Sequence, residues 1–156
     1  MYQAYWQITE KPFENTLDPR FYYPSESHQE ALLKLRYAIE NRGEAALVTG
    51  SSGMGKTLPV SMLRNLLGER FRPWVEVGFP PMPPQELLAY LADALEGTES
   101  DFHDAPLSRS IQRIGRLIAE AANEGRHPVI VLEDAHLITD PEKWEVLRLL
   151  LNFRAG

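Results

Sequence analysis

The residues best suited to chemistry form one glycine-rich segment, GSSGMGKT, at positions 50–57. This segment fits the pattern G-x-x-x-x-G-K-[ST], whose glycines let successive backbone N–H groups turn toward an anion. We expect Lys56 to bind the β- and γ-phosphates of ATP or ADP, and the Thr57 hydroxyl to ligate Mg²⁺. The alternative is a glycine-rich turn with a solvated lysine. The remaining nucleotide contacts are predicted at Gly50, Ser52, Gly53, Met54, Gly55 and Leu58.

Two acids follow the apolar run at 129–132, namely Glu133 and Asp134. Neighbouring residues of a strand point to opposite faces, so the two carboxylates are expected to have separate roles. We expect Glu133 to reach Mg²⁺ through a water, and Asp134 to orient or deprotonate the water that attacks ATP. Buried strands that end in acids are common, so the acidic pair indicates a nucleotide site only in combination with the glycine-rich loop. Together the two motifs predict an ATPase with Lys56, Glu133 and Asp134 as its catalytic residues.

Short apolar runs that do not alternate with polar residues indicate buried strands at 45–49, 74–79 and 129–132. Helical periodicity and stop signals predict helices before, between and after these three strands. The predicted helices run over about 27–41, from the loop to Gly68, from Pro84 to Gly97, over about 108–124, and from Pro141 onward. Strands that alternate with helices indicate a parallel sheet. We therefore predict an α/β fold, a three-layer αβα sandwich with a mainly parallel sheet.

Composition narrows the classes of protein that remain. The chain has 156 residues, no cysteine, and 16 Lys and Arg against 22 Asp and Glu, a net charge of −6. These values predict one folded domain over 1–156, without disulfides or thiolate metal sites. An acidic chain has no overall field that attracts nucleic acid or anionic lipid. No stretch approaches the ~18 apolar residues of a membrane span, so we expect a cytoplasmic protein.

The N-terminal part of the chain has a distinctive pattern of aromatic and polar residues, and a shorter pattern follows the acidic pair. With the glycine-rich loop, these patterns resemble the ExeA/GspA-type general secretion pathway ATPases of the AAA+ class. The residues that carry the resemblance are Met1-Tyr2, Tyr5-Trp6, Lys11-Pro12-Phe13, Asp18 to Tyr23, Ser25, His28, Glu30-Ala31-Leu32, Leu147 to Leu150, and Asn152-Phe153.

The resemblance implies an ATPase module that helps to assemble a secretion apparatus. It implies an inner-membrane anchor in longer relatives, and partners that are further copies of the chain or a membrane-anchored secretion protein. It also implies that the aromatic segment 1–26 packs on the core and, with the start of the first helix, frames the adenine. His28 falls at the adenine side in this comparison.

Three departures from the family pattern bear on activity. The acidic pair has the order Glu133-Asp134 instead of Asp-Glu, which predicts slow hydrolysis. Leu58-Pro59 replaces Thr-Leu after the loop, which removes a hydroxyl expected at the α-phosphate. The sequence ends at Gly156, before the expected sensor strand and helical lid. We therefore expect a truncated core with a gap in its sheet, in which the strands at 45–49 and 129–132 pair directly or leave edges open to self-association.

Two other functions stay open on the sequence alone. One is a nucleotide-dependent switch or scaffold with weak hydrolysis. The other is a transposition-type ATPase that associates with DNA. The helix over 108–124 carries Arg109, Arg113 and Arg116 on one side, which indicates either a basic stripe for DNA, acidic lipid or a neighbouring subunit, or a solvated polar face.

Overall fold

The computed structural model describes residues 5–9, 22–98 and 106–153. The chain divides into two compact units, 1–66 and 67–156. The single domain expected over 1–156 stays a prediction. Most of the aromatic segment that carries the family resemblance, residues 1–4 and 10–21, lies outside the described residues.

The second unit is built on two parallel strands, β1 (Trp74–Val77) and β2 (Val129–Leu132). Trp74 pairs with Val129 at one end and Val77 with Leu132 at the other. Parallel strands need a long crossover connection, and here it consists of α4 (Pro84–Glu96) and α5 (Leu107–Asn123). The α/β class and the parallel sheet are therefore confirmed.

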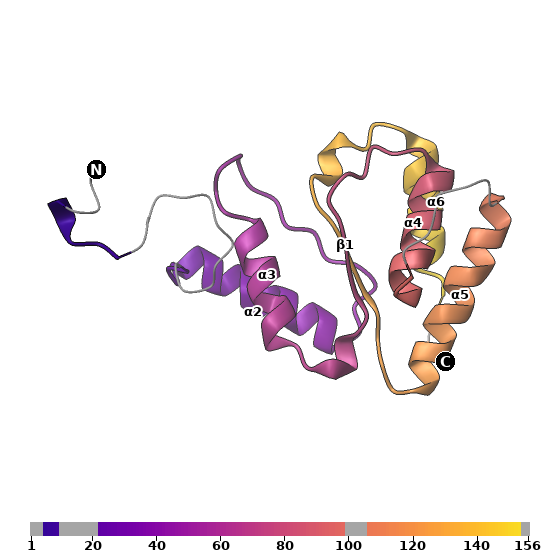
Figure 1. Ribbon diagram of the computed structural model, residues 1–156, viewed down its shortest axis with the longest axis horizontal. Coiled ribbons are helices and arrows are strands. Elements are labelled where there is room, and N and C mark those ends of the chain that lie inside the picture. The colour runs from indigo at the N-terminus through magenta and orange to yellow at the C-terminus, as the bar shows by residue number, and fades with distance from the viewer. Residues whose placement is uncertain (1–4, 10–21, 99–105, 154–156) are drawn as a thin grey trace. The chain divides into compact units, whose positions relative to one another are not determined.

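The core of this unit lies between one face of the sheet and the helices α4, α5 and α6 (Pro141–Leu150) (Figure 1). Val75 and Val77 point to that face because alternate residues of a strand share a side, and both are buried. Ile130 and Leu132 stand opposite them and pack against the same cluster. The helices contribute Leu87, Leu88, Leu91, Ala92, Leu95, Ile114, Val146 and Leu150.

The helix boundaries of this unit follow the local signals in the sequence. Pro84 occupies the first turn of α4, where its missing N–H has no intrahelical partner to lose. Gly97 ends α4 in the left-handed conformation, with φ 74°. Asp140 caps α6, since its side chain accepts a hydrogen bond from the Glu142 N–H at 2.9 Å. These three ends are where the sequence predicts them.

Buried Lys143 connects α6 to the proline-rich turn that follows β1. Its ammonium group donates to the Pro81 carbonyl oxygen at 2.7 Å. Two short 3₁₀ helices, η2 (Glu69–Phe71) and η3 (Ala135–Leu137), lie before β1 and after β2. The second of these turns begins directly at the acidic pair.

The first unit contains α2 (Glu26–Glu40) and α3 (Thr57–Leu66), which pack against each other (Figure 1). The strand predicted at 45–49 is wrong. The segment has no regular secondary structure, and Leu47 is 81% exposed. A strand needs a neighbour for its backbone N–H and C=O groups, and the described part of this unit contains no strand to pair with. Direct pairing of 45–49 with 129–132, one of the two expected alternatives, requires a strand at 45–49, and the structure has none there.

The described aromatic residues near the N-terminus differ in their environment. Tyr5, Trp6 and Tyr23 are exposed, and the first two contact each other edge to face. Tyr22 is half-buried, and its ring stacks on His28. These positions bear on the prediction that residues 1–26 pack on the core, which stays a prediction for the segment as a whole.

Candidate functional site: a glycine-rich loop and an acidic pair

The glycine-rich loop places glycine where the backbone demands it. Gly53 and Gly55 have φ angles of 79° and 71°, a backbone conformation that residues other than glycine rarely adopt. The Met54 N–H donates to the Ser51 carbonyl at 3.4 Å, which closes a turn inside the loop. The helix α3 starts at Thr57 and adds the positive end of its dipole. A tight loop that leads into a helix N-terminus has the chemistry of an anion site.

Lys56 lies along the loop that precedes it. Its ammonium group donates to the carbonyl oxygens of Gly50 and Ser51, at 3.1 and 3.0 Å. The positive charge is therefore held at the loop itself. Thr57 follows as the half-buried first residue of α3.

The acidic pair stands at the carboxyl end of β2. The Glu133 N–H donates to the Val77 carbonyl at 3.0 Å, so the ladder continues one residue beyond the strand. Asp134 then leaves the strand with φ 48° and ψ 39°, at the N-cap position of η3 but without a side-chain cap hydrogen bond. Its side chain is 61% exposed, and its carboxylate lies 3.8 Å from Nδ1 of His136. Strand alternation does not apply to this pair, because Glu133 and Asp134 lie in a turn and Asp134 has a left-handed backbone. The separate roles of the two carboxylates stay a prediction.

The two motifs belong to different units of the structure. Residues 50–57 lie in the first unit, and Glu133 and Asp134 lie in the second. Within the first unit the fold brings Lys56, Gly50 and Ser51 together. Within the second unit it brings Glu133 next to the end of β1, through Val77.

A loop contact from His28 is a feature that the sequence patterns do not reveal. Nε2 of His28 lies 2.9 Å from the carbonyl oxygen of Met54. The residue stands in the first turn of α2, 26 positions before Met54. In the sequence, only the family resemblance indicates a role for His28, because it implies a position at the adenine side of the nucleotide.

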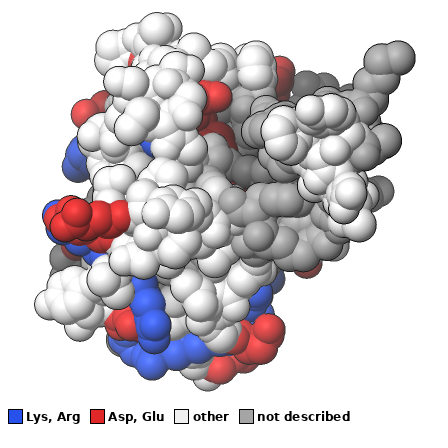
Figure 2. All heavy atoms as spheres, turned by 90° about the vertical axis from the view of Figure 1, so that its left-hand side faces the viewer, with Lys and Arg blue, Asp and Glu red and all other residues white. Residues whose placement is uncertain are grey.

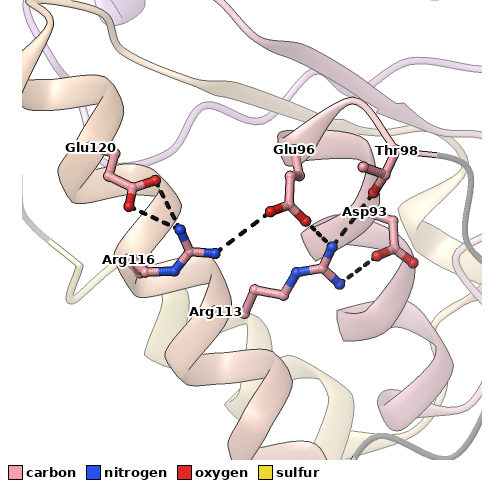
Figure 3. Close-up of polar contacts among 6 residues, drawn as sticks. All are labelled: Asp93, Glu96, Thr98, Arg113, Arg116 and Glu120. Atoms are coloured by element: carbon pink, nitrogen blue, oxygen red, sulfur yellow. Dashed lines mark hydrogen bonds and ion pairs between the residues drawn. The ribbon is translucent and has the colours of Figure 1, made fainter.

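The arginines of α5 differ in their environment, since Arg109 and Arg116 are exposed and Arg113 is half-buried. Arg113 donates to Asp93 and Glu96 of α4 and, at 3.5 Å, to the Thr98 hydroxyl (Figure 3). Hydrogen bonding to Arg113 lowers the pKa of Glu96 below its ordinary value. Arg113 is therefore neither part of a free basic stripe nor fully solvated, since it pairs with Asp93 and Glu96 of the same unit. The sequence pattern of α5 could not reveal this, because the acidic partners belong to α4.

Arg116 lies one turn further along the same side of α5. It bridges Glu120 of its own helix, at 2.9 Å, and Glu96, at 3.6 Å (Figure 3). On the face drawn in Figure 2, positive and negative side chains also lie next to each other. Mixed signs of this kind weaken the local field that a nucleic acid would need.

The comparisons with known proteins address the same regions. A family model described as an AAA domain matches residues 39–156, a range that includes the loop and the acidic pair. The chain belongs to the AAA domain family. It is also 33% identical over 156 residues to the general secretion pathway protein A of Aeromonas hydrophila. No solved structure matches the chain.

This AAA domain is similar to the Aeromonas protein over 97% of its own sequence, and it spans 27% of the length of that relative. The resemblance to ExeA/GspA-type ATPases is therefore confirmed. Family membership and this similarity support a nucleotide-binding ATPase module. In the described part of the chain, every helix is too short or too polar to cross a membrane.

Proposed function

We propose that this AAA domain binds ATP with Mg²⁺ through residues 50–57 and hydrolyses it to ADP and phosphate. The observation that carries the proposal is the backbone of the loop, with Gly53 and Gly55 at positive φ directly before the helix that begins at Thr57. Such a backbone turns N–H groups toward an anion, and the helix dipole favours negative charge at the same end.

Each predicted residue has a role in this proposal. The Lys56 ammonium binds the β- and γ-phosphates. The Thr57 hydroxyl would ligate Mg²⁺, which prefers hard oxygen donors, and the Glu133 carboxylate would reach the ion through a water. Mg²⁺ neutralises charge on the phosphates. Asp134 orients the attacking water and accepts its proton. Leu58 stands where the resembled family pattern has a threonine hydroxyl, and in this proposal it contacts the nucleotide through its backbone.

The binding part is tested by calorimetric titration of the chain with Mg²⁺-ATP. Lys56→Ala is expected to remove most of the affinity. Lys34→Ala is the matched control, because it removes the same charge from the same unit at an exposed position, where Lys34 pairs with Glu30 at 2.6 Å. Equal affinity of wild type and Lys56→Ala would contradict the proposed site.

The hydrolytic part is tested by phosphate release at saturating ATP. Asp134→Asn removes the carboxylate and keeps a residue that tolerates left-handed backbone. We expect turnover to fall by about 10²-fold or more, the range of general-base removal, with ATP affinity retained. Unchanged turnover would exclude Asp134 as the base.

The second candidate is a nucleotide-dependent switch or scaffold with weak hydrolysis. The observation that favours it is Asp134 itself, whose side chain is exposed. It is also one methylene shorter than the glutamate that the resembled family pattern has at this position. Tight ATP binding without phosphate release by the wild-type chain would support this candidate. A DNA-associated ATPase is the third candidate, and retention of duplex DNA at physiological salt would support it.

The similarity to general secretion pathway protein A supports a proposal for the cellular role and location of this module. We place the module in the assembly of a secretion apparatus, in the cytoplasm at the inner-membrane face, with further copies of the chain or a membrane-anchored secretion protein as its partner. Copurification of the chain with inner-membrane secretion components tests this placement.

A further inference from the structure

His28 connects the first turn of α2 to the glycine-rich loop. The Ser25 hydroxyl oxygen caps the helix and accepts a hydrogen bond from the His28 N–H at 3.4 Å, which fixes the histidine backbone. The imidazole Nε2 lies 2.9 Å from the Met54 carbonyl oxygen. A carbonyl oxygen only accepts hydrogen bonds, so Nε2 carries the hydrogen and donates it.

The imidazole ring is held in place by its neighbours. A Cβ built on Gly55 would lie 3.4 Å from Cε1 of His28, so the ring packs against the bare backbone of that glycine. The Tyr22 ring stacks on the imidazole, with centroids 6.3 Å apart and 20° between the planes. The direction of the Nε2–H bond is therefore fixed by packing as well as by the hydrogen bond.

This hydrogen bond determines the orientation of one peptide plane. The bond between Met54 and Gly55 is trans. In a planar trans peptide, the C=O and N–H groups point in opposite directions. Holding the Met54 carbonyl on His28 therefore turns the Gly55 N–H away from the histidine.

We propose that His28 is a positioning residue for phosphate binding, because its hold on the Met54 carbonyl orients the Gly55 N–H toward the phosphates. This inference rests on the proposed function, and it assigns a role to His28 that is separate from contact with the base. A donor oriented before the ligand arrives saves the free energy of ordering it on binding.

Two substitutions separate hydrogen bonding from packing. His28→Gln keeps an N–H donor at nearly the reach of Nε2 and removes the ring. His28→Phe keeps a ring against Gly55 and Tyr22 and removes the donor. The positioning role predicts that phosphate affinity is retained in His28→Gln and reduced in His28→Phe. A role in packing alone predicts the reverse order.

Two probes separate phosphate from base. Mg²⁺-ATP and Mg²⁺-tripolyphosphate, which has no base, are each titrated calorimetrically into wild type and both variants. We expect His28→Phe to weaken both probes by about five- to tenfold, the range of one hydrogen bond. A loss confined to ATP would overturn the inference and assign His28 to the base.

Failure of the inference and failure of the proposed function give different results. If wild type binds ATP, Lys56→Ala does not, and His28→Phe binds as wild type does, the nucleotide site stands and the inference is overturned. If wild type binds neither probe, both are overturned. Retained affinity in His28→Gln with loss in His28→Phe supports the inference.

A measurement on the wild-type chain keeps the test independent of how the variants fold. Nitrogen-15 NMR of the imidazole identifies the ring nitrogen that carries the hydrogen. We expect Nε2–H, and a ring with hydrogen on Nδ1 alone would overturn the inference. Far-UV circular dichroism establishes which variants are folded before their affinities are compared.

Discussion

The ion-pair cluster between α4 and α5 allows a quantitative prediction for Arg113→Met. The Asp93 side chain is 7% exposed, and its carboxylate pairs with the guanidinium of Arg113, whose side chain is 33% exposed. Removing one partner of a fully buried pair costs about 3–5 kcal/mol. Because Arg113 is partly solvated, we expect a smaller loss of about 2–3 kcal/mol in the free energy of unfolding. For a chain of this size, that loss lowers Tm by about 5–10 °C.

The assay is urea unfolding followed by circular dichroism, with Arg116→Met as the matched control on the same helix. Arg116 is about half exposed and pairs with half-exposed Glu120, so its loss is expected to leave the unfolding midpoint unchanged. Combining Arg113→Met with Asp93→Leu should recover stability, because the buried carboxylate is then gone as well. Equal midpoints for Arg113→Met and Arg116→Met would refute this reasoning.

Two further predictions concern pH and packing. The pKa of Glu96 is lowered, chiefly by its hydrogen bond to Arg113, so the pair stabilises the fold above the ordinary pKa of 4.5, and this contribution is lost as pH falls through the lowered value. In Glu96→Gln, Tm should therefore fall less steeply than in wild type as pH is lowered below about 4.5. An equally steep fall in both proteins would contradict this. A Cβ on Gly115 would lie 2.9 Å from the Phe153 ring, so Gly115→Ala should lower Tm in the otherwise wild-type chain. In a Phe153→Leu background the clash is absent, and Gly115→Ala should raise Tm because alanine favours the helix over glycine by about 1 kcal/mol. The same sign in both backgrounds would exclude this clash.

The elements that the sequence predicts well are those with local causes. The helix α4 has a proline at its start, leucines on one face and a glycine at its end, and each of these acts within a few residues. The two glycines of the loop are predicted for a similar reason, because a left-handed φ is a local demand on one residue. The parallel pairing of β1 with β2 follows from their separation by helices.

The features that the sequence does not predict depend on distant partners. The run at 45–49 has the composition of a strand, but a strand forms only where another strand accepts its hydrogen bonds. Asp134 has the position of a strand residue, but the 3₁₀ turn that follows it imposes a left-handed backbone. The contacts of Arg113 and His28 join separate helices and loops, and periodicity within one element carries no information about them.

The loop carbonyls show how the fold can prepare its proposed phosphate site. Lys56 holds the carbonyl oxygens of Gly50 and Ser51, and His28 holds that of Met54. Each held carbonyl turns the N–H of the same peptide the other way, so side chains determine the orientation of three peptide planes of the loop. Lys56→Ala removes two of these holds together with the charge, and its loss of affinity therefore combines orientation with attraction. His28→Phe removes one hold, that on Met54, and no charge, so its loss of affinity measures the orientation of a single peptide plane by itself.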